Sequence, residues 1–147
     1  MEKYSSRINE KIHNLKLIIT QLETTLPKTI EEYETNFVIL AACERFAEKT
    51  IEEIITTSNI ILKEKGITQR EKCFEILNDL DIIPKELAKK LEQMKGMRNL
   101  MVHSYDSFDT EVFFDSLKEL IIDTKEYIKA IKKLINETNT RKIKQNS

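Results

Sequence analysis

The chain has 147 residues, of which 40% are hydrophobic and 33% are charged, and its formal net charge is −1. This composition predicts one soluble globular domain, and it excludes a disordered chain and a protein that coats nucleic acid non-specifically. Two glycines and two prolines are too few for the turns of a β-sandwich or β-barrel, so long helices are expected. No apolar run approaches the roughly 20 residues of a membrane span, and the first residues lack the apolar core of a signal peptide. We therefore expect a cytoplasmic protein without a membrane partner.

Apolar residues at three- and four-residue steps predict helices along most of the chain. The expected helices cover residues 4–26, 29–66, 68–80, 84–105 and 110–135. Capping boxes at Thr29-Glu32 and Thr68-Glu71 open the second and third of these helices, and Gly66 ends the second. The predicted fold class is all-α, an up-and-down bundle of about five helices. Residues 1–138 are expected to form a single domain, followed by a basic tail over 139–147 that frays.

The second helix carries an acidic residue within its apolar stripe. The stripe consists of Tyr33, Phe37, Leu40, Ala47, Ile51, Ile54 and Ile61, and Glu44 lies on the same face. A carboxylate there must be partly hydrated, form a local contact, or pair with a cation. The sharper hypothesis is that Glu44 is a buried acid that pairs with an arginine of the helix predicted over 84–105.

Few other residues suggest chemistry. Cys43 and Cys73 are far apart and form no paired-cysteine motif, so both are interpreted as buried thiols of a reduced compartment. His13 lies beside an apolar stripe without an acidic or histidine partner four residues on, which favours a partly exposed histidine over a ligand. No metal site and no cofactor are expected.

Residues 96–106 bring together residue types that are rare in this chain, among them one of its two histidines and one of its two glycines. Within eight positions it holds Arg98, Asn99, His103 and Tyr105. On a helix with about 100° per residue, Asn99 and His103 share a face, so the Asn99 amide could fix the tautomer of the imidazole. Arg98 points about 140° away from His103, toward the core-facing side. One straight helix cannot aim both groups at one phosphate unless the arginine stem wraps round the helix or the helix deforms near its end. A second copy across a two-fold axis would also supply the missing group.

These residue types suit the cleavage of RNA without a metal ion, which leaves a 2′,3′-cyclic phosphate. A histidine with a near-neutral pKa can accept the 2′-OH proton or protonate the leaving 5′ oxygen. A guanidinium can bind the phosphate and stabilise the charge of the transition state. Arginine and histidine near a helix end also commonly bond backbone carbonyls, and residue chemistry alone favours that structural alternative.

The order of these residues, R-N-x-x-x-H-x-Y from Arg98 to Tyr105, resembles the R-x4-H-x-Y signature of HEPN-domain proteins of the HepT type. The similarity extends from about Thr35 to Ile135, and it includes Glu44-Arg45, Phe74 to Leu77, Ile82 to Pro84, Leu87 to Leu91 and Gly96 to Asn99.

The resemblance implies a helical bundle that forms a homodimer, with two motifs at a shared cleft. It implies a ribonuclease toxin in which Arg98 and His103 are catalytic. From their positions on the predicted helices, we expect Asn99 and Glu44 to support them. The resemblance also implies a partner, a nucleotidyltransferase antitoxin of the MNT type that transfers AMP from ATP to Tyr105. AMP on Tyr105 would place negative charge and bulk where the RNA phosphate lies.

Two other functions stay open at this point. The protein could be a non-catalytic helical dimer that docks a nucleotidyltransferase as its binding subunit or substrate. It could also be a structural helical protein in which Arg98 pairs with Glu44. Cleavage of RNA would distinguish the toxin from both.

Overall fold

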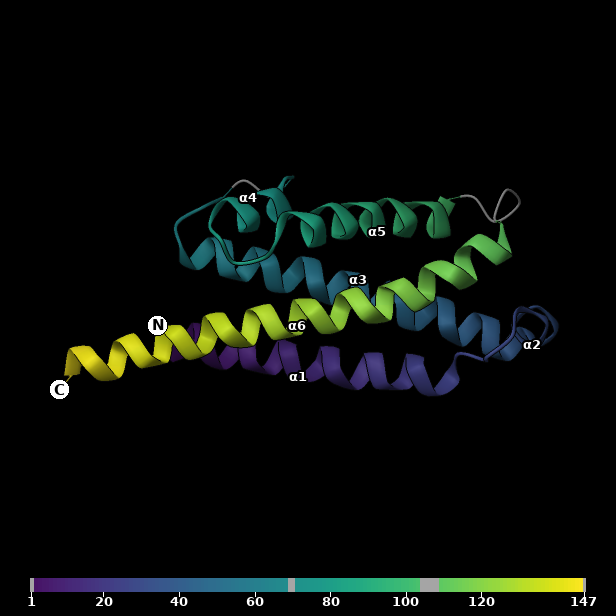
Figure 1. The fold of residues 1–147 in the computed structure, drawn as a ribbon, viewed down its shortest axis with the longest axis horizontal. Coiled ribbons are helices and arrows are strands. Elements are labelled where there is room, and N and C mark those ends of the chain that lie inside the picture. The colour runs from purple at the N-terminus through teal and green to yellow at the C-terminus, as the bar shows by residue number, and fades with distance from the viewer. Residues whose placement is uncertain (1, 69–70, 104–108, 147) are drawn as a thin grey trace.

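Six helices make up the part of the chain that the structure describes. The computed structural model describes the backbone of residues 2–68, 71–103 and 109–146, and the side chains of residues 6–68, 71–99 and 109–141. The helices are α1 (Glu2–Thr25), α2 (Ile30–Thr35), α3 (Phe37–Glu64), α4 (Cys73–Asp79), α5 (Lys85–His103) and α6 (Thr110–Asn146). Figure 1 shows the four long helices α1, α3, α5 and α6 packed along the molecule, with α2 at one end and α4 at the other. The described residues include no strand, so the predicted all-α bundle is confirmed, with six helices in place of about five.

The apolar stripes of α1 and α6 are buried against α3 and against each other, as their periodicity predicts. In α1 the buried side chains are Ile8, Ile12, Leu15, Ile19 and Leu22. In α6 they include Phe113, Leu117, Leu120, Ile128, Ile131 and Ile135. Burial of these stripes removes apolar surface from water, which is the main favourable contribution to folding of the bundle.

The prediction of a single helix over residues 29–66 is wrong in one respect. Two helices, α2 and α3, cover this segment, and Asn36 separates them. Asn36 has φ −118° and ψ 102°, an extended conformation that interrupts helical hydrogen bonding. Its side-chain Oδ1 accepts hydrogen bonds from the backbone N–H groups of Val38 at 3.1 Å and Ile39 at 3.2 Å. Asparagine is a favoured N-cap residue, so Asn36 ends α2 and starts α3 in a single step.

This break changes which residues of the predicted stripe reach the core. Tyr33 of α2 is buried, and its ring lies 5.2 Å from the ring of Phe114 in α6. Phe37, directly after the break, is 84% exposed, so the prediction that it belongs to the core is wrong. From Ala47 onward the stripe of α3 is buried as predicted.

The start of α4 also differs from the prediction. The capping box predicted at Thr68-Glu71 does not open this helix. Instead, α4 begins at Cys73, and Lys72 at the N-cap makes no side-chain capping hydrogen bond. Residues 71 and 72, directly before α4, therefore form a turn outside the helix.

Other predicted features of the connections and the core are confirmed. Gly66 follows α3 with φ +78°, a left-handed conformation that favours glycine. Pro84 directly precedes α5. Cys43 and Cys73 are buried free thiols, and burial raises the pKa of each to about 11, so neither is a thiolate near neutral pH.

The last helix, α6, continues to Asn146 and so includes most of the predicted tail. The division of the chain at residue 138 and the fraying of the tail stay predictions. α1 begins and α6 ends at one end of the bundle, whereas α5 ends at the other (Figure 1). Within the described residues, none of the helices has the length and apolar character needed to cross a membrane.

Candidate active site

The predicted site lies on the final turns of α5, which ends at His103. The side chains of Arg98 and Asn99 are described. The imidazole of His103 and the whole of Tyr105 lie outside the described residues, so their predicted roles stay predictions. The geometry of the site therefore rests on Arg98 and on the helices that surround it.

Arg98 points from α5 toward α3, as the helical wheel predicts. Its Nη2 donates a hydrogen bond to Oε1 of Glu52 at 3.1 Å, and its side chain is 35% exposed. Asn99, the next residue, is exposed on the face that also holds Glu92 and Gly96. The turn of about 100° between successive helical residues separates these two directions.

The prediction that Arg98 pairs with Glu44 is wrong, because the carboxylate that pairs with Arg98 belongs to Glu52. Eight residues separate the two glutamates, which is about 12 Å along α3. Glu44 is half-buried and lies near Cys43, whose pKa is raised by burial and then by the negative charge of Glu44. A supporting role of Glu44 at the site stays a prediction.

Glu52 is thus the residue of the site that sequence reasoning missed. One local signal was present, since Glu52 directly follows the buried Ile51 and stands at the edge of the apolar stripe. A carboxylate at a stripe edge can reach a neighbouring helix, but the sequence does not say which residue of that helix it meets.

A second carboxylate beside Glu52 faces the opposite neighbour of α3. Oε1 of Glu53 lies 3.2 Å from Nζ of Lys11 in α1, and both side chains are partly buried. Two adjacent acids of α3 therefore connect it to α1 on one side and to α5 on the other.

Glu52 also lines a polar groove between α1 and α3, together with Asn14, Leu17, Ile18, Gln21, Arg45, Lys49 and Glu53. The Arg98–Glu52 pair consequently borders an open surface.

Among the described side chains, this arrangement orients a guanidinium without using all of its donors. A guanidinium has five N–H groups in a planar fork, and Glu52 accepts from one nitrogen of Arg98. Both partners are more than a third exposed, and ion pairs of this kind contribute only about 0–1 kcal/mol. A phosphate could therefore share Arg98 with Glu52 or displace the carboxylate at little cost. Within the described part of the chain, no cluster of three or more His, Cys, Asp or Glu side chains is suited to hold a metal ion.

Comparison with known proteins assigns the family. The sequence profile of a family described as Ribonuclease HepT-like matches residues 15–131 of the chain. A protein of Archaeoglobus fulgidus named as a candidate RNase is 33% identical over 73 residues, which are 48% of this chain and 55% of that protein. The chain thus spans about half the length of this relative.

Solved structures share the fold at low sequence identity. A tri-AMPylated HEPN toxin of Shewanella oneidensis, in complex with an MNT antitoxin, superposes with a TM-score of 0.77 at 22% identity, over 85% of this chain and 96% of that one. YutE, a cytosolic protein of unknown function from Bacillus subtilis, superposes with a TM-score of 0.75 at 17% identity, over 90% of this chain and 91% of that one. Because the family profile covers most of the sequence and includes the whole segment from Arg98 to Tyr105, the chain belongs to the HepT-like ribonuclease family.

Proposed function

We propose that the protein is the ribonuclease toxin of a toxin–antitoxin pair in the cytoplasm, and that it cleaves RNA through Arg98 and His103 without a metal ion. One observation carries this proposal. Arg98 is oriented by Glu52 yet stays partly exposed, and among the described residues Glu52 is the hydrogen-bond acceptor of its guanidinium. It also lies within the segment matched by the profile of a ribonuclease family. An arginine in this state suits a transient phosphate ligand.

The reaction needs only groups that RNA and the chain contain. The 2′ oxygen attacks the adjacent phosphorus, the bond from phosphorus to the 5′ oxygen breaks, and a 2′,3′-cyclic phosphate forms. The imidazole of His103 accepts the 2′-OH proton, and an imidazolium returns a proton to the leaving 5′ oxygen. Arg98 stabilises the negative charge that grows on the phosphoryl oxygens, and Asn99 supports the imidazole.

The active form in this proposal is a homodimer. Arg98 faces α3, whereas helical geometry places His103 about 140° around α5, so one straight helix does not direct both groups at one phosphate and a second copy would supply the missing group. Exposed apolar side chains near the end of the bundle where α5 stops and α6 begins support self-association. Phe37 is 84% exposed, Val38 78% and Val112 61%, although side chains of this size are usually buried.

Control of the toxin would act on Tyr105. We expect an MNT-type nucleotidyltransferase to catalyse attack of the tyrosine oxygen on the α-phosphorus of ATP, so that AMP is attached and pyrophosphate leaves. The added AMP would repel an RNA phosphate at the neighbouring arginine. The structural neighbour from Shewanella oneidensis supports this step, since it is a tri-AMPylated HEPN toxin in complex with an MNT antitoxin.

A second function is favoured by the Arg98–Glu52 contact itself. Arg98 already binds a carboxylate in the free chain, as an arginine would if it served to dock an acidic surface of a partner. In that case the protein is a non-catalytic helical dimer that binds a nucleotidyltransferase as its subunit or substrate.

RNA cleavage in excess EDTA distinguishes the two functions. The purified chain, His103→Ala and Arg98→Ala are incubated with RNA, after mass spectrometry has confirmed that Tyr105 carries no AMP. We expect cleavage by the parent protein alone, with 2′,3′-cyclic phosphate ends. Circular dichroism controls for folding of the variants. No cleavage by a folded parent dimer would instead favour the docking function, and equal cleavage by His103→Ala would exclude the assigned role of His103.

A further inference from the structure

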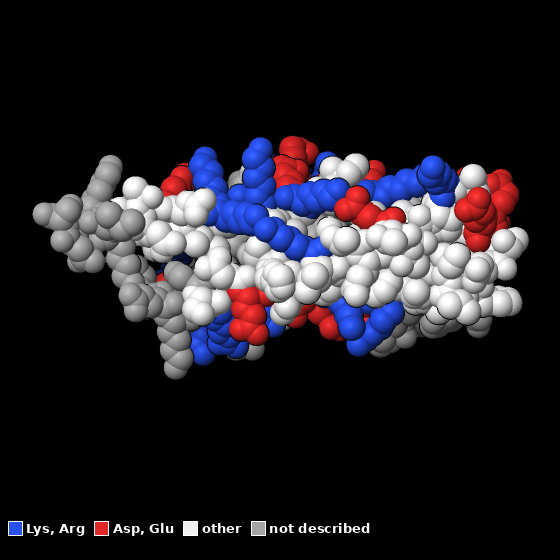
Figure 2. Space-filling view, turned by 90° about the horizontal axis from the view of Figure 1, so that it is seen from below, with Lys and Arg blue, Asp and Glu red and all other residues white. Residues whose placement is uncertain are grey.

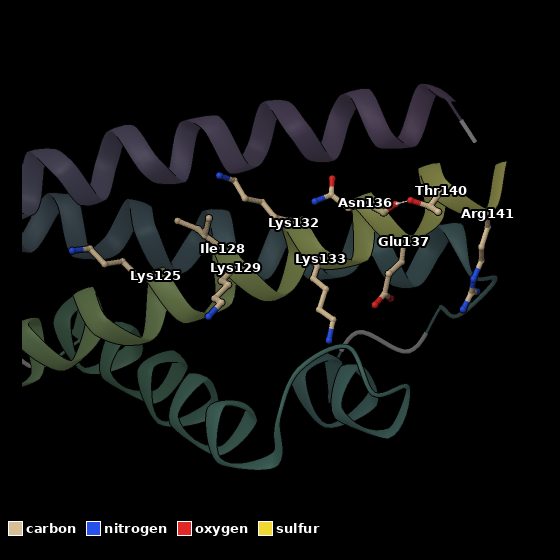
Figure 3. A pocket seen from close by; sticks show the side chains of 9 residues that line it. All are labelled: Lys125, Ile128, Lys129, Lys132, Lys133, Asn136, Glu137, Thr140 and Arg141. Atoms are coloured by element: carbon tan, nitrogen blue, oxygen red, sulfur yellow. Dashed lines mark hydrogen bonds between the residues drawn. The ribbon is translucent and has the colours of Figure 1, made fainter. Parts of the chain in front are cut away.

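The second half of α6 forms a basic face away from Arg98. Residues 110–124 carry four acidic side chains and one basic one, whereas residues 125–141 carry five basic and two acidic ones. Basic side chains follow one long edge of the surface in Figure 2, where α6 lies beside α1. An open groove runs along α6 on this side, and Figure 3 shows its lining side chains between Lys125 and Arg141. A chain with a net charge of −1 therefore concentrates positive charge on part of one helix.

Most of these basic groups lack an acidic partner. Lys125 pairs with Glu23 of α1, at 2.9 Å between Nζ and Oε1. The ion pairs formed among the described side chains include none of the remaining four, which are Lys129, Lys132, Lys133 and Arg141. We call these four residues the α6 basic cluster. Glu137 also lines the groove, but among the described side chains it forms no ion pair with any of the four.

One member of the α6 basic cluster lies next to another lysine from a different helix. Lys132 is directed toward α1 (Figure 3), where its contact with Lys16 lowers the pKa of the Lys16 ammonium. Two lysines held together by the packing of α1 on α6 repel each other. An anion placed against both would relieve this repulsion.

The helix macrodipole does not account for the α6 basic cluster. The dipole favours cations at a helix C-terminus, but its effect falls off within the last turn. Lys129, Lys132 and Lys133 lie more than three turns before the end of α6 at Asn146.

We infer that the α6 basic cluster binds the phosphate backbone of the RNA, as a second contact surface remote from the phosphate that reacts at Arg98. The inference rests on the proposed function, and it states how the RNA substrate is held. The start of α6 at Thr110 lies at the end of the bundle where α5 stops. Lys129 lies about 28 Å further along α6 from this point. The four charges extend over about 18 Å of helix, which suits several consecutive phosphates rather than one small anion.

The composition of the groove favours RNA over an acidic protein. Ile128 is the one apolar residue among those that line it. Protein interfaces have an apolar centre enriched in aromatic residues and methionine, and lysine is depleted there. A lining made mostly of lysine, arginine and polar side chains instead matches the sequence-independent contacts that proteins make with phosphates.

Salt-dependent binding tests this inference. A fluorescent single-stranded RNA with 2′-O-methyl groups cannot be cleaved by its own 2′ oxygen, and its binding is followed by anisotropy. The four charges of the α6 basic cluster predict a contribution of about −2.8 to the slope of log K against log salt, which is a loss of roughly 50-fold between about 50 and 200 mM salt. Lys132→Gln/Lys133→Gln leaves two of these contacts, so this contribution should fall to about −1.4 and the loss to roughly 7-fold.

A matched double variant controls for the loss of two charges. Lys28→Gln/Lys89→Gln removes two exposed lysines outside the groove and should keep the parent slope. The inference is overturned if Lys132→Gln/Lys133→Gln binds RNA like the parent, or if it loses only binding to a purified nucleotidyltransferase partner. Cleavage of unmodified RNA is measured in parallel. Its absence in the parent would overturn the proposed function, while the binding slopes still decide the role of the α6 basic cluster.

Discussion

Arg98 is held by a carboxylate from another helix, and the strength of this contact is measurable. We predict that a double-mutant cycle of Glu52→Gln and Arg98→Gln gives a coupling of about 0.2–1 kcal/mol in the free energy of unfolding, because both side chains are more than a third exposed. Urea unfolding followed by circular dichroism provides the values. A cycle with Glu44→Gln is the control, and a larger coupling there would contradict the placement of Arg98 beside Glu52.

Two buried tyrosines differ in the hydrogen bonding of their hydroxyl groups. The hydroxyl of Tyr127 lies 2.7 Å from Oγ of Ser58 and donates to the carbonyl of Ile54 at 3.3 Å. The hydroxyl of Tyr33 is buried and has no hydrogen-bond partner among the described residues. Tyr127→Phe should lower the free energy of unfolding by about 1–3 kcal/mol, because Ser58 loses its partner. Tyr33→Phe should leave this free energy unchanged or raise it, and an equal loss in both variants would contradict the different bonding of the two hydroxyls.

At the scale of the elements, the division between α2 and α3 depends on one side chain. Asn36 caps α3 through two backbone N–H groups, and loss of such a cap costs about 1 kcal/mol. Asn36→Ala should lower the midpoint of urea unfolding accordingly, with little change in the slope of the transition. Asn9→Ala, at an exposed position within α1, should have no effect or a stabilising one, since alanine is the better helix former. A similar loss in both variants would mean that the cap contributes nothing.

At the scale of the whole molecule, the proposed dimer should depend on the exposed apolar end of the bundle. Phe37→Glu/Val38→Glu places two charges where apolar side chains are 84% and 78% exposed, so it should shift the protein from dimer to monomer. Sedimentation velocity at micromolar concentration measures this change. Ile122→Glu is the control, because Ile122 is 64% exposed but lies in the middle of α6. A monomeric parent would contradict the dimer, and an equal effect of both variants would move the interface elsewhere.

The helices and most of the core could be predicted from the sequence. Leu15, Leu117 and Ile131 are fully buried, because an apolar stripe with helical period can leave water only on one face. The exception at Phe37 arose because its spacing continued the stripe across Asn36, and periodicity alone did not reveal the capping that breaks the helix there. The direction of Arg98 away from Asn99 also followed from the sequence, since it depends only on the turn per residue.

The sequence by itself therefore determined the fold class, the family signature and the side of α5 on which Arg98 lies. Each of these depends on local spacing along one chain segment. Only the tertiary structure decided that Glu52 rather than Glu44 meets Arg98, because the axial register of α3 against α5 depends on how the two helices pack on each other and on α4. The same holds for Lys16 and Lys132, which are distant in sequence and meet only because α1 packs against α6. Contacts between helices depend on register and packing, and neither is encoded in the period of a single helix.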